Sequence, residues 1–378
     1  MKIAMIGAKG APATYGGVER HVEELSRRLA ARGHEVTIYC RRHYTPAGSA
    51  LPRVTLRILP SIHTTRLDSI SHTALALADA ARGDFDLIHF HAIGPSLLSF
   101  LPRAWPGRRA VVATVHALDW QRRKWGPVAR WWLRRGEWAA TTFPQRTIVV
   151  SRLMEERFRN RGKQAIYIPN GVPEPQSAPI SELARYGIAE PGFILWMGRF
   201  VPEKRVEDLI GAVREMPAVR QLVLAGEVDD SAYCRRLREL ARGEARILFP
   251  GGLYGAAKSA ALSHAGAFVL PSEMEGFPIA LLEAMRYGLP VLASNIPENL
   301  EALTPGVSGF AFRTGDAGSL RERLDWMLSH PVEAQAAGAR AREEAARYDW
   351  ERIALETERV YAEAAALATA LGRSMDMH

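Results

Sequence analysis

The sequence predicts an α/β protein built from two doubly wound domains, each with a parallel β-sheet covered by helices. Short apolar runs without polar alternation recur along the chain, as expected of strands that are buried on both faces. Segments with helical periodicity separate these runs, which is typical of repeated βα units. A stretch with four prolines, residues 169–179, divides the runs into two series and is typical of a linker.

The first series begins at the N-terminus, where residues 2–7 predict a buried strand. Residues 18–31 then predict a helix, because Val18, Val22, Leu25 and Leu29 share one face and Gly33 follows as a stop signal. Further strands are expected at residues 35–40, 86–91, 110–116, 147–151 and 165–168.

The second series lies beyond the linker. Its expected strands are residues 193–197, 221–225, 245–249, 267–270, 290–293 and 309–312, each followed by a glycine, proline or polar turn. We therefore expect an N-terminal domain over 1–171 and a C-terminal domain over 172–349. A helix rich in alanine and glutamate, about 350–378, is expected to return to the first domain. Ligands of such sheets bind beyond the carboxyl ends of the strands, so the expected site is the cleft between the domains.

Composition limits the cellular setting. The chain has 378 residues and two cysteines, Cys40 and Cys234, which lack metal-ligand spacing and fit a reducing compartment without disulfides. No apolar stretch reaches the roughly 18 residues of a membrane span, and the first apolar run is too short for a signal peptide. We expect a soluble, cytoplasmic protein. The net charge of +8 is compatible with nucleic acid, anionic lipid or an acidic small substrate.

The most informative feature is a pair of glutamates, Glu275 and Glu283, around the start of a predicted helix. A strand over 267–270 precedes them, Pro278 suits the first helical position, and Gly288 ends the helix. A bare helix N-terminus favours anions, and a carboxylate beside it can hold sugar hydroxyls. Glutamates near helix starts are also common for stability alone, since each gains ~0.3–1 kcal/mol from the helix dipole.

Two loops at strand ends carry further candidates. Gly16 and Gly17 precede the first helix and allow the backbone to approach a phosphate or sugar closely. This loop matches neither the dinucleotide nor the nucleoside-triphosphatase fingerprint, and its glycines could instead serve only a flexible turn. In the second domain, Arg199 and Lys204 follow the strand over 193–197, where two cations can neutralise a diphosphate.

Histidines and tryptophans form two more groups. His116 ends the expected strand over 110–116, and His89 and His91 lie at the end of the expected strand over 86–91. Such histidines serve either a cleft or a hydrogen-bonded core. Residues 120–146 combine five tryptophans with arginines and a lysine. This segment includes Trp131, Trp132, Arg134 and Arg135. It predicts either contact with an anionic membrane or a helix that packs its tryptophans inward, with nucleic-acid stacking a weaker alternative.

Together these residues resemble the retaining glycosyltransferases of family 4, which have the GT-B fold. The resemblance covers nearly the whole chain, and its most specific part is the spacing from Glu275 to Glu283, similar to the E-x7-E motif of that family. The loop over 7–19, with residues 116–120, resembles a bacterial branch often described as rhamnosyltransferases. That branch commonly has arginine in place of Lys9 and phenylalanine in place of Val18.

The resemblance implies a role for each motif. Arg199 and Lys204 would hold the donor diphosphate, Glu283 the ribose hydroxyls and Glu275 the donor-sugar hydroxyls. His116 would lie near the donor sugar. The remaining donor contacts would come from the Gly16–Gly17 loop, the turn at Gly276, Phe277 and Pro278, and the strand end at Phe249. Transfer would retain the anomeric configuration without a metal or other cofactor, because the cations and a helix N-terminus supply positive charge.

The implied activity is transfer from a nucleotide-diphosphate sugar to a lipid-linked or growing surface glycan, in bacterial polysaccharide or cell-envelope biosynthesis. The implied location is the cytoplasmic face of the membrane, with Trp131, Trp132, Arg134 and Arg135 on the acceptor or membrane side. A nucleotide-sugar epimerase of GT-B fold is an alternative. A basic nucleic-acid-binding protein is another, which the absence of a recognisable nucleic-acid module disfavours.

Overall fold

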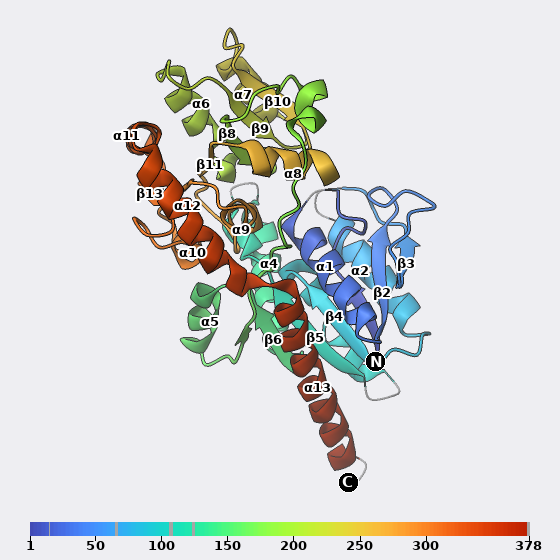
Figure 1. Cartoon of the computed structure of the whole chain (residues 1–378). Helices are drawn as coiled ribbons and strands as arrows, with labels where there is room; N and C mark the ends of the chain where they lie inside the picture. The colour runs from blue at the N-terminus through green and yellow to red at the C-terminus, as the bar shows by residue number, and fades with distance from the viewer. Residues whose placement is uncertain (15, 65–66, 106–108, 123–124, 376–378) are drawn as a thin grey trace. The chain divides into compact units, whose positions relative to one another are not determined.

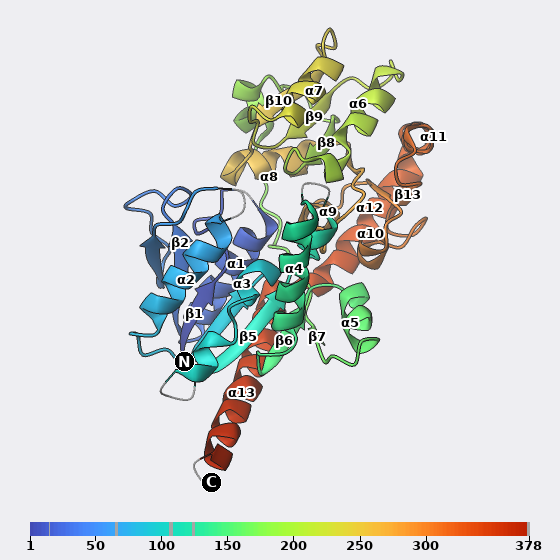
Figure 2. The same cartoon turned by 180° about the vertical axis from the view of Figure 1, so that it is seen from behind.

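The computed structural model of the chain describes residues 1–14, 16–64, 67–105, 109–122 and 125–375 (Figures 1 and 2). Tyr15 in the glycine-containing loop, and Arg123 and Lys124 in the tryptophan-rich segment, lie outside the described residues. The chain forms two compact units. Unit 1 comprises Met1–Asn170 and Trp350–His378, and unit 2 comprises Gly171–Asp349.

Unit 1 contains a sheet of seven described strands in the order β3-β2-β1-β4-β5-β6-β7, all parallel. The strands are β1 Lys2–Ile6, β2 Glu35–Arg41, β3 Val54–Leu59, β4 Leu87–His91, β5 Ala110–Val115, β6 Arg146–Val149 and β7 Ile166–Tyr167. The helices are α1 Gly17–Ala31, α2 Asp68–Ala80, α3 Ile93–Ser96, α4 Pro127–Ala140, α5 Arg152–Arg159 and α13 Trp350–Met375, with 3-10 turns at Leu101–Ala104 and Asp119–Gln121.

The central strands of unit 1 are buried on both faces, which explains their unbroken apolar sequences. Ile3 of β1 pairs with Val36 on one side and with Leu87 on the other. The strand order reverses between β1 and β4, and this is the switch point at which doubly wound sheets bind ligands.

The edge strand β3 is absent from the sequence-based expectations. It pairs with β2 from Val54 to Leu59, with Val36 opposite Val54. As an edge strand it alternates between buried or partly buried positions and the exposed Thr55 and Arg57, and Arg57 pairs with Asp79 of α2. Its six residues therefore lack the continuous apolar run by which the buried strands were recognised.

Helix α13 packs on the rest of unit 1, and Figure 1 shows it beside α1. Trp350 and Tyr361 are fully buried in the core that contains β1, β2 and β4. Ion pairs at the surface add to this contact, with Arg32 bound to Glu358 at 2.7 Å. Within the described part of the chain, no helix, α13 included, has the length and apolar character needed to cross a bilayer.

Unit 2 contains a second parallel sheet, with six described strands in the order β10-β9-β8-β11-β12-β13. The strands are β8 Ile194–Met197, β9 Leu222–Ala225, β10 Ile247–Gly251, β11 Ala267–Leu270, β12 Val291–Ser294 and β13 Phe310–Phe312. The helices are α6 Val206–Arg214, α7 Ala232–Leu240, α8 Gly255–His264, α9 Ile279–Arg286, α10 Pro297–Ala302, α11 Ala317–Ser329 and α12 Pro331–Ala345, with 3-10 turns at Ile180–Tyr186, Pro202–Lys204 and Ala346–Tyr348.

The predicted fold class, two doubly wound parallel-sheet domains, is confirmed. In unit 2 the strand order reverses between β8 and β11, which are hydrogen-bonded neighbours. The loops that leave these two strands therefore emerge side by side. These loops carry Arg199 and Lys204 after β8, and Glu275 after β11.

Candidate functional site

The centre of the candidate site in unit 2 is a direct ion pair between Lys204 and Glu275. Lys204 ends the 3-10 turn after β8, and Glu275 lies in the loop after β11. The side chains of Lys204 and Glu275 are only 18% and 10% exposed. The sheet switch point thus brings together two residues that lie 71 positions apart in sequence.

A second set of contacts ties the same two loops together. Arg205 has a left-handed backbone with φ of 48° and binds Asp208 at 2.6 Å and Glu273 at 3.5 Å. The backbone N–H of Glu273 donates to the carbonyl of Glu203 at 2.9 Å. These bonds fix the loop that carries Lys204 against the loop that carries Glu275.

Glu283 lies on the second turn of α9, and its side chain is only 5% exposed. Its Oε1 accepts a hydrogen bond from Nζ of Lys258 on α8 at 2.6 Å. Glu275 and Glu283 therefore each pair with a lysine, but from different elements. Sequence reasoning missed Lys258, because α8 gives no local signal that one of its side chains reaches α9.

The turn between the two glutamates has a buried anchor. Phe277 is buried, and its ring centroid lies 5.3 Å from that of Tyr348. Pro278 takes the N-cap position, one residue before the first helical position predicted for it, and α9 begins at Ile279. Gly276 is partly exposed, so the turn can offer backbone groups while the Phe277 ring holds it in place.

Two other residues border these loops in unit 2. Arg199 is partly buried directly after β8. Phe249 on β10 lies with its ring centroid 5.8 Å from that of Phe200, and Phe200 in turn stacks on Trp196 at 5.0 Å.

The charge of Glu275 acts on a third carboxyl group, that of Glu298, which sequence reasoning missed. Burial raises the pKa of Glu298, which lies at the start of α10, and the negative charge of Glu275 acts in the same direction. The Glu298 carboxyl group is therefore easier to protonate than an exposed one.

In unit 1, the loop between β1 and α1 is held by carboxylates of α1. Glu19 accepts from the backbone N–H of Lys9 at 3.1 Å, and Glu23 accepts from that of Ala13 at 2.5 Å. Gly16 is the N-cap of α1 with φ of 103°, and a Cβ there would lie 1.9 Å from Oε2 of Glu19. Because L side chains rarely adopt this positive φ, glycine is favoured at Gly16. The described part of the loop is anchored, which disfavours the flexible-turn interpretation.

Beside this loop lies a buried cluster of His21, His91 and His116. His91 ends β4, His116 follows β5, and His21 comes from α1. Nδ1 of His91 lies 3.1 Å from Nε2 of His116, and Nδ1 of His21 lies 3.0 Å from Oδ1 of Asn170. Sequence reasoning missed His21, because it sits among the polar positions of α1.

Burial controls the charge of this cluster. Burial lowers the pKa of His21 to about 4 and holds the pKa values of His91 and His116 well below 6.5. The three imidazoles are therefore neutral at pH 7 and can exchange hydrogen bonds without adding positive charge. Their ligand atoms lie within 4.8 Å of one another, which is close enough to hold a metal ion. An ion would have to replace the hydrogen bond between His91 and His116.

The other predicted histidine, His89, is a core residue. Its two ring nitrogens bond Tyr361 of α13 at 2.6 Å and Thr114 of β5 at 2.7 Å. Both ring nitrogens are thus occupied within unit 1, and His89 is fully buried.

On α4, Trp131 and Trp132 are 50% and 52% exposed. Arg135 lies over the ring of Trp131 at 5.0 Å, and Arg134 lies over that of Trp120 at 4.7 Å. The interpretation that the segment packs its tryptophans inward is therefore wrong for Trp131 and Trp132.

Both halves of the chain match known families. Residues 15–174 match the model of Glycosyltransferase Family 4, and residues 182–344 match that of Glycosyl transferases group 1. A similar curated protein is the phosphatidyl-myo-inositol mannosyltransferase of Mycobacterium leprae, which is 28% identical over 92% of each chain.

Solved structures with the same fold include the sucrose-phosphate synthase of Thermosynechococcus elongatus. It has a TM-score of 0.85 and 24% identity, over 97% of this chain and 99% of that one. HepE of Anabaena in complex with UDP-glucose has a TM-score of 0.79 and 19% identity, over 96% of this chain and 99% of that one.

Proposed function

Because the chain is a glycosyltransferase of the family 4 type with a group 1 domain, we propose that it transfers a sugar from a nucleotide-diphosphate sugar. The observation that carries this proposal is the Lys204–Glu275 pair at the switch point of unit 2. It sets a cation and a carboxylate side by side, as a ligand with a phosphate next to a sugar hydroxyl requires. The complex of HepE with UDP-glucose supports a donor of this class.

In the proposed donor complex, the diphosphate takes over Lys204 from Glu275 and also binds Arg199. Glu275 is then released to accept hydrogen bonds from donor-sugar hydroxyls. The exchange replaces one charge-assisted bond by another, so that neither buried charge is left unpaired. The turn at Gly276, Phe277 and Pro278 contributes backbone groups.

Glu283 is proposed to bind the ribose hydroxyls, with the hydrogen bond from Lys258 orienting its carboxylate. The base is assigned to the strand end near Phe249. From unit 1, the Gly16–Gly17 loop and the neutral imidazole of His116 are assigned to the donor sugar and its phosphate.

The reaction is proposed to retain the anomeric configuration and to need no metal. Lys204 and Arg199 would offset the charge that develops on the leaving diphosphate, which is the role a divalent cation would otherwise fill. This places the largest part of the catalytic effect on these two cations.

The acceptor is proposed to be a lipid-linked or growing surface glycan, met at the cytoplasmic face of a bacterial membrane. The exposed Trp131 and Trp132, with Arg134 and Arg135, support this, since tryptophan and arginine favour the interface of anionic bilayers. The name of the mycobacterial relative, a phosphatidyl-myo-inositol mannosyltransferase, also supports a lipid acceptor.

The test begins with a thermal-shift screen of nucleoside diphosphates, because a ligand that binds only the folded chain raises its Tm. The nucleotide sugar with the stabilising base is then incubated with a polyprenyl-phosphate sugar acceptor. Glu275→Gln and Lys204→Met are expected to lower turnover at least a hundredfold. Wild-type turnover in either variant would refute the proposed site.

The matched control is Glu239→Gln with Arg242→Met. These residues form an exposed ion pair at 2.6 Å in the same unit, and the double variant should keep wild-type turnover. The products separate transfer from epimerisation. An epimerase would convert the nucleotide sugar without acceptor and keep its sugar–phosphate bond, an outcome that would overturn the transferase assignment.

A further inference from the structure

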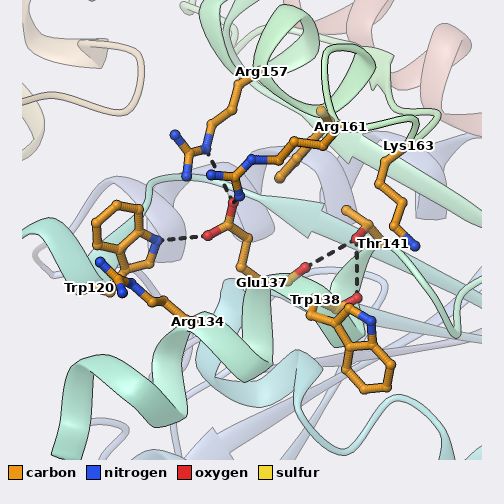
Figure 3. A pocket seen from close by; sticks show the side chains of 9 residues that line it. Trp120, Arg134, Glu137, Trp138, Thr141, Arg157, Arg161 and Lys163 are labelled. Atoms are coloured by element: carbon orange, nitrogen blue, oxygen red, sulfur yellow. Dashed lines mark hydrogen bonds and ion pairs between the residues drawn. The ribbon is translucent and has the colours of Figure 1, made fainter. Parts of the chain in front are cut away.

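A cavity of about 380 Å³ opens in unit 1 between α4 and the segment that contains α5 (Figure 3). Its volume lies within the range of small-ligand sites. The described residues that line it include four cationic side chains and one carboxylate, an excess of three positive charges. The cations are Arg134, Arg157, Arg161 and Lys163.

The carboxylate of Glu137 organises the cavity. It is buried and accepts three hydrogen bonds: from Nε of Arg157 at 3.2 Å, from Nη1 of Arg161 at 3.0 Å and from Nε1 of Trp120 at 2.8 Å. Figure 3 shows Arg157 and Arg161 reaching from one side toward Glu137, with Trp120 facing it from another. One carboxylate thus fixes two guanidinium groups close together, which their mutual repulsion would otherwise oppose.

The guanidinium groups keep donors for a second acceptor. Each carries five N–H groups, and the contact with Glu137 engages Nε of Arg157 and one terminal nitrogen of Arg161. The Arg161 side chain is 55% exposed, so it lies at the mouth of the cavity. Clusters of arginine donors match the oxygens of a phosphate group, which can accept several bonds at once.

The surface next to the cavity indicates where such a phosphate comes from. Trp138 lines the cavity and lies seven residues after Trp131, so both project from the same side of α4. Trp131, Trp132 and Trp138 are about half exposed, and Val128 at the start of the helix is 71% exposed. Apolar and aromatic side chains beside a cationic cavity fit the boundary between lipid head groups and acyl chains.

We propose that this cavity binds the phosphate of an anionic phospholipid and so holds α4 at the membrane surface. The choice of a lipid as the source of the phosphate rests on the membrane contact in the proposed function. The cavity would recognise the head group, while the exposed tryptophans of α4 enter the interface.

The test compares vesicle binding of two variants with the same loss of charge. Arg134→Gln with Arg161→Gln removes one cation of the cavity from each side and leaves Arg157 to pair with Glu137. Arg130→Gln with Arg159→Gln removes one exposed cation each from α4 and α5, outside the cavity. Co-sedimentation is measured with three kinds of vesicle: phosphatidylcholine alone, phosphatidylcholine with phosphatidylglycerol, and phosphatidylcholine with enough oleic acid to carry the same negative charge as the phosphatidylglycerol vesicles.

On phosphatidylglycerol vesicles, the cavity variant should bind roughly tenfold more weakly than the control variant. Both variants lose two charges, but only the cavity variant loses directed hydrogen bonds to the phosphate. On oleate vesicles the two variants should bind alike. Equal weakening on phosphatidylglycerol would show a general charge effect and overturn the proposal.

Soluble phosphate gives the second arm. If inorganic phosphate or glycerol phosphate raises the Tm of the wild type but not of the cavity variant, while vesicles bind both alike, the ligand is a soluble phosphate and the lipid assignment is wrong. Nucleoside diphosphate stabilisation of the wild type is measured in parallel. If nucleoside diphosphates stabilise the wild type but both variants bind phosphatidylglycerol vesicles alike, the cavity proposal alone is refuted. If nucleoside diphosphates do not stabilise the wild type, the result counts against the proposed donor site.

Discussion

The Lys258–Glu283 pair offers a test of the candidate site that does not require a known substrate. Lys258→Met keeps most of the apolar stem of the lysine but removes its charge. It leaves the carboxylate of Glu283, whose side chain is 5% exposed in the wild type, without the partner that lies 2.6 Å away. Breaking a buried ion pair by removing one member costs ~3–5 kcal/mol.

The expected magnitude is smaller than this full cost, because Lys258 is 28% exposed and water screens part of the pair. We therefore expect the free energy of unfolding of unit 2 to fall by ~2–3 kcal/mol. Glu283→Gln should cost only ~1 kcal/mol, since the flexible lysine left behind can reach solvent. The double variant should be more stable than the sum of the single effects predicts, by ~1–2 kcal/mol.

The assay is hydrogen exchange of peptides from α8 and α9, together with urea unfolding followed by circular dichroism. For a unit of this size, a loss of ~2–3 kcal/mol corresponds to a fall in Tm of roughly 5–10 °C. An additive double variant, or a Lys258→Met chain within ~0.5 kcal/mol of wild type, would refute the reasoning that Lys258 stabilises a buried carboxylate.

The remaining predictions concern the histidine cluster and two packing positions. Because burial lowers the pKa of His21 to about 4, the unfolded chain binds more protons at this histidine between pH 6.5 and 4, which should cost ~3 kcal/mol of stability as pH drops through this window. Free energies of unfolding from urea titrations at several pH values should therefore fall less steeply with decreasing pH in His21→Gln than in the wild type. Gly136→Ala sets a methyl group 2.1 Å from the carbonyl oxygen of Ile93 and should lower the Tm by several degrees, whereas Gly126→Ala, with open space, should not; equal Tm values would contradict this. Arg246→Lys should cost ~1–3 kcal/mol, because the guanidinium donates to four backbone carbonyls, and unchanged urea unfolding would refute that role.

The sequence patterns predicted the fold class because strands buried on both faces need continuous apolar runs, and such runs remain visible without an alignment. The edge strand β3 was not predicted, because a strand with one exposed face can tolerate Arg57 and other polar residues. Recognising β3 requires knowing that β2 lies beside it, and this pairing is a feature of the tertiary structure.

The candidate site shows the same limit. Lys204 and Glu275 could be named from their positions after strands, but their contact depends on β8 and β11 being neighbours, which sequence order does not give. Lys258 and His21 lie within helices, where a lysine or histidine is normally solvated. Only the packing of those helices turns them toward Glu283 and His116.

The two carboxylates assigned to the donor are each already neutralised by a lysine, and this bears on how unit 2 would select its ligand. A ligand that is only an anion can bind Lys204 only by displacing the carboxylate of Glu275. That carboxylate is then left as a poorly solvated charge without its partner. A neutral sugar alone could bond Glu275 but would leave Lys204 unpaired. A ligand that carries both a phosphate and vicinal hydroxyls satisfies both partners at once. Such coupling favours an intact nucleotide sugar over free phosphate or free sugar, because either fragment leaves one partially buried charge without a partner.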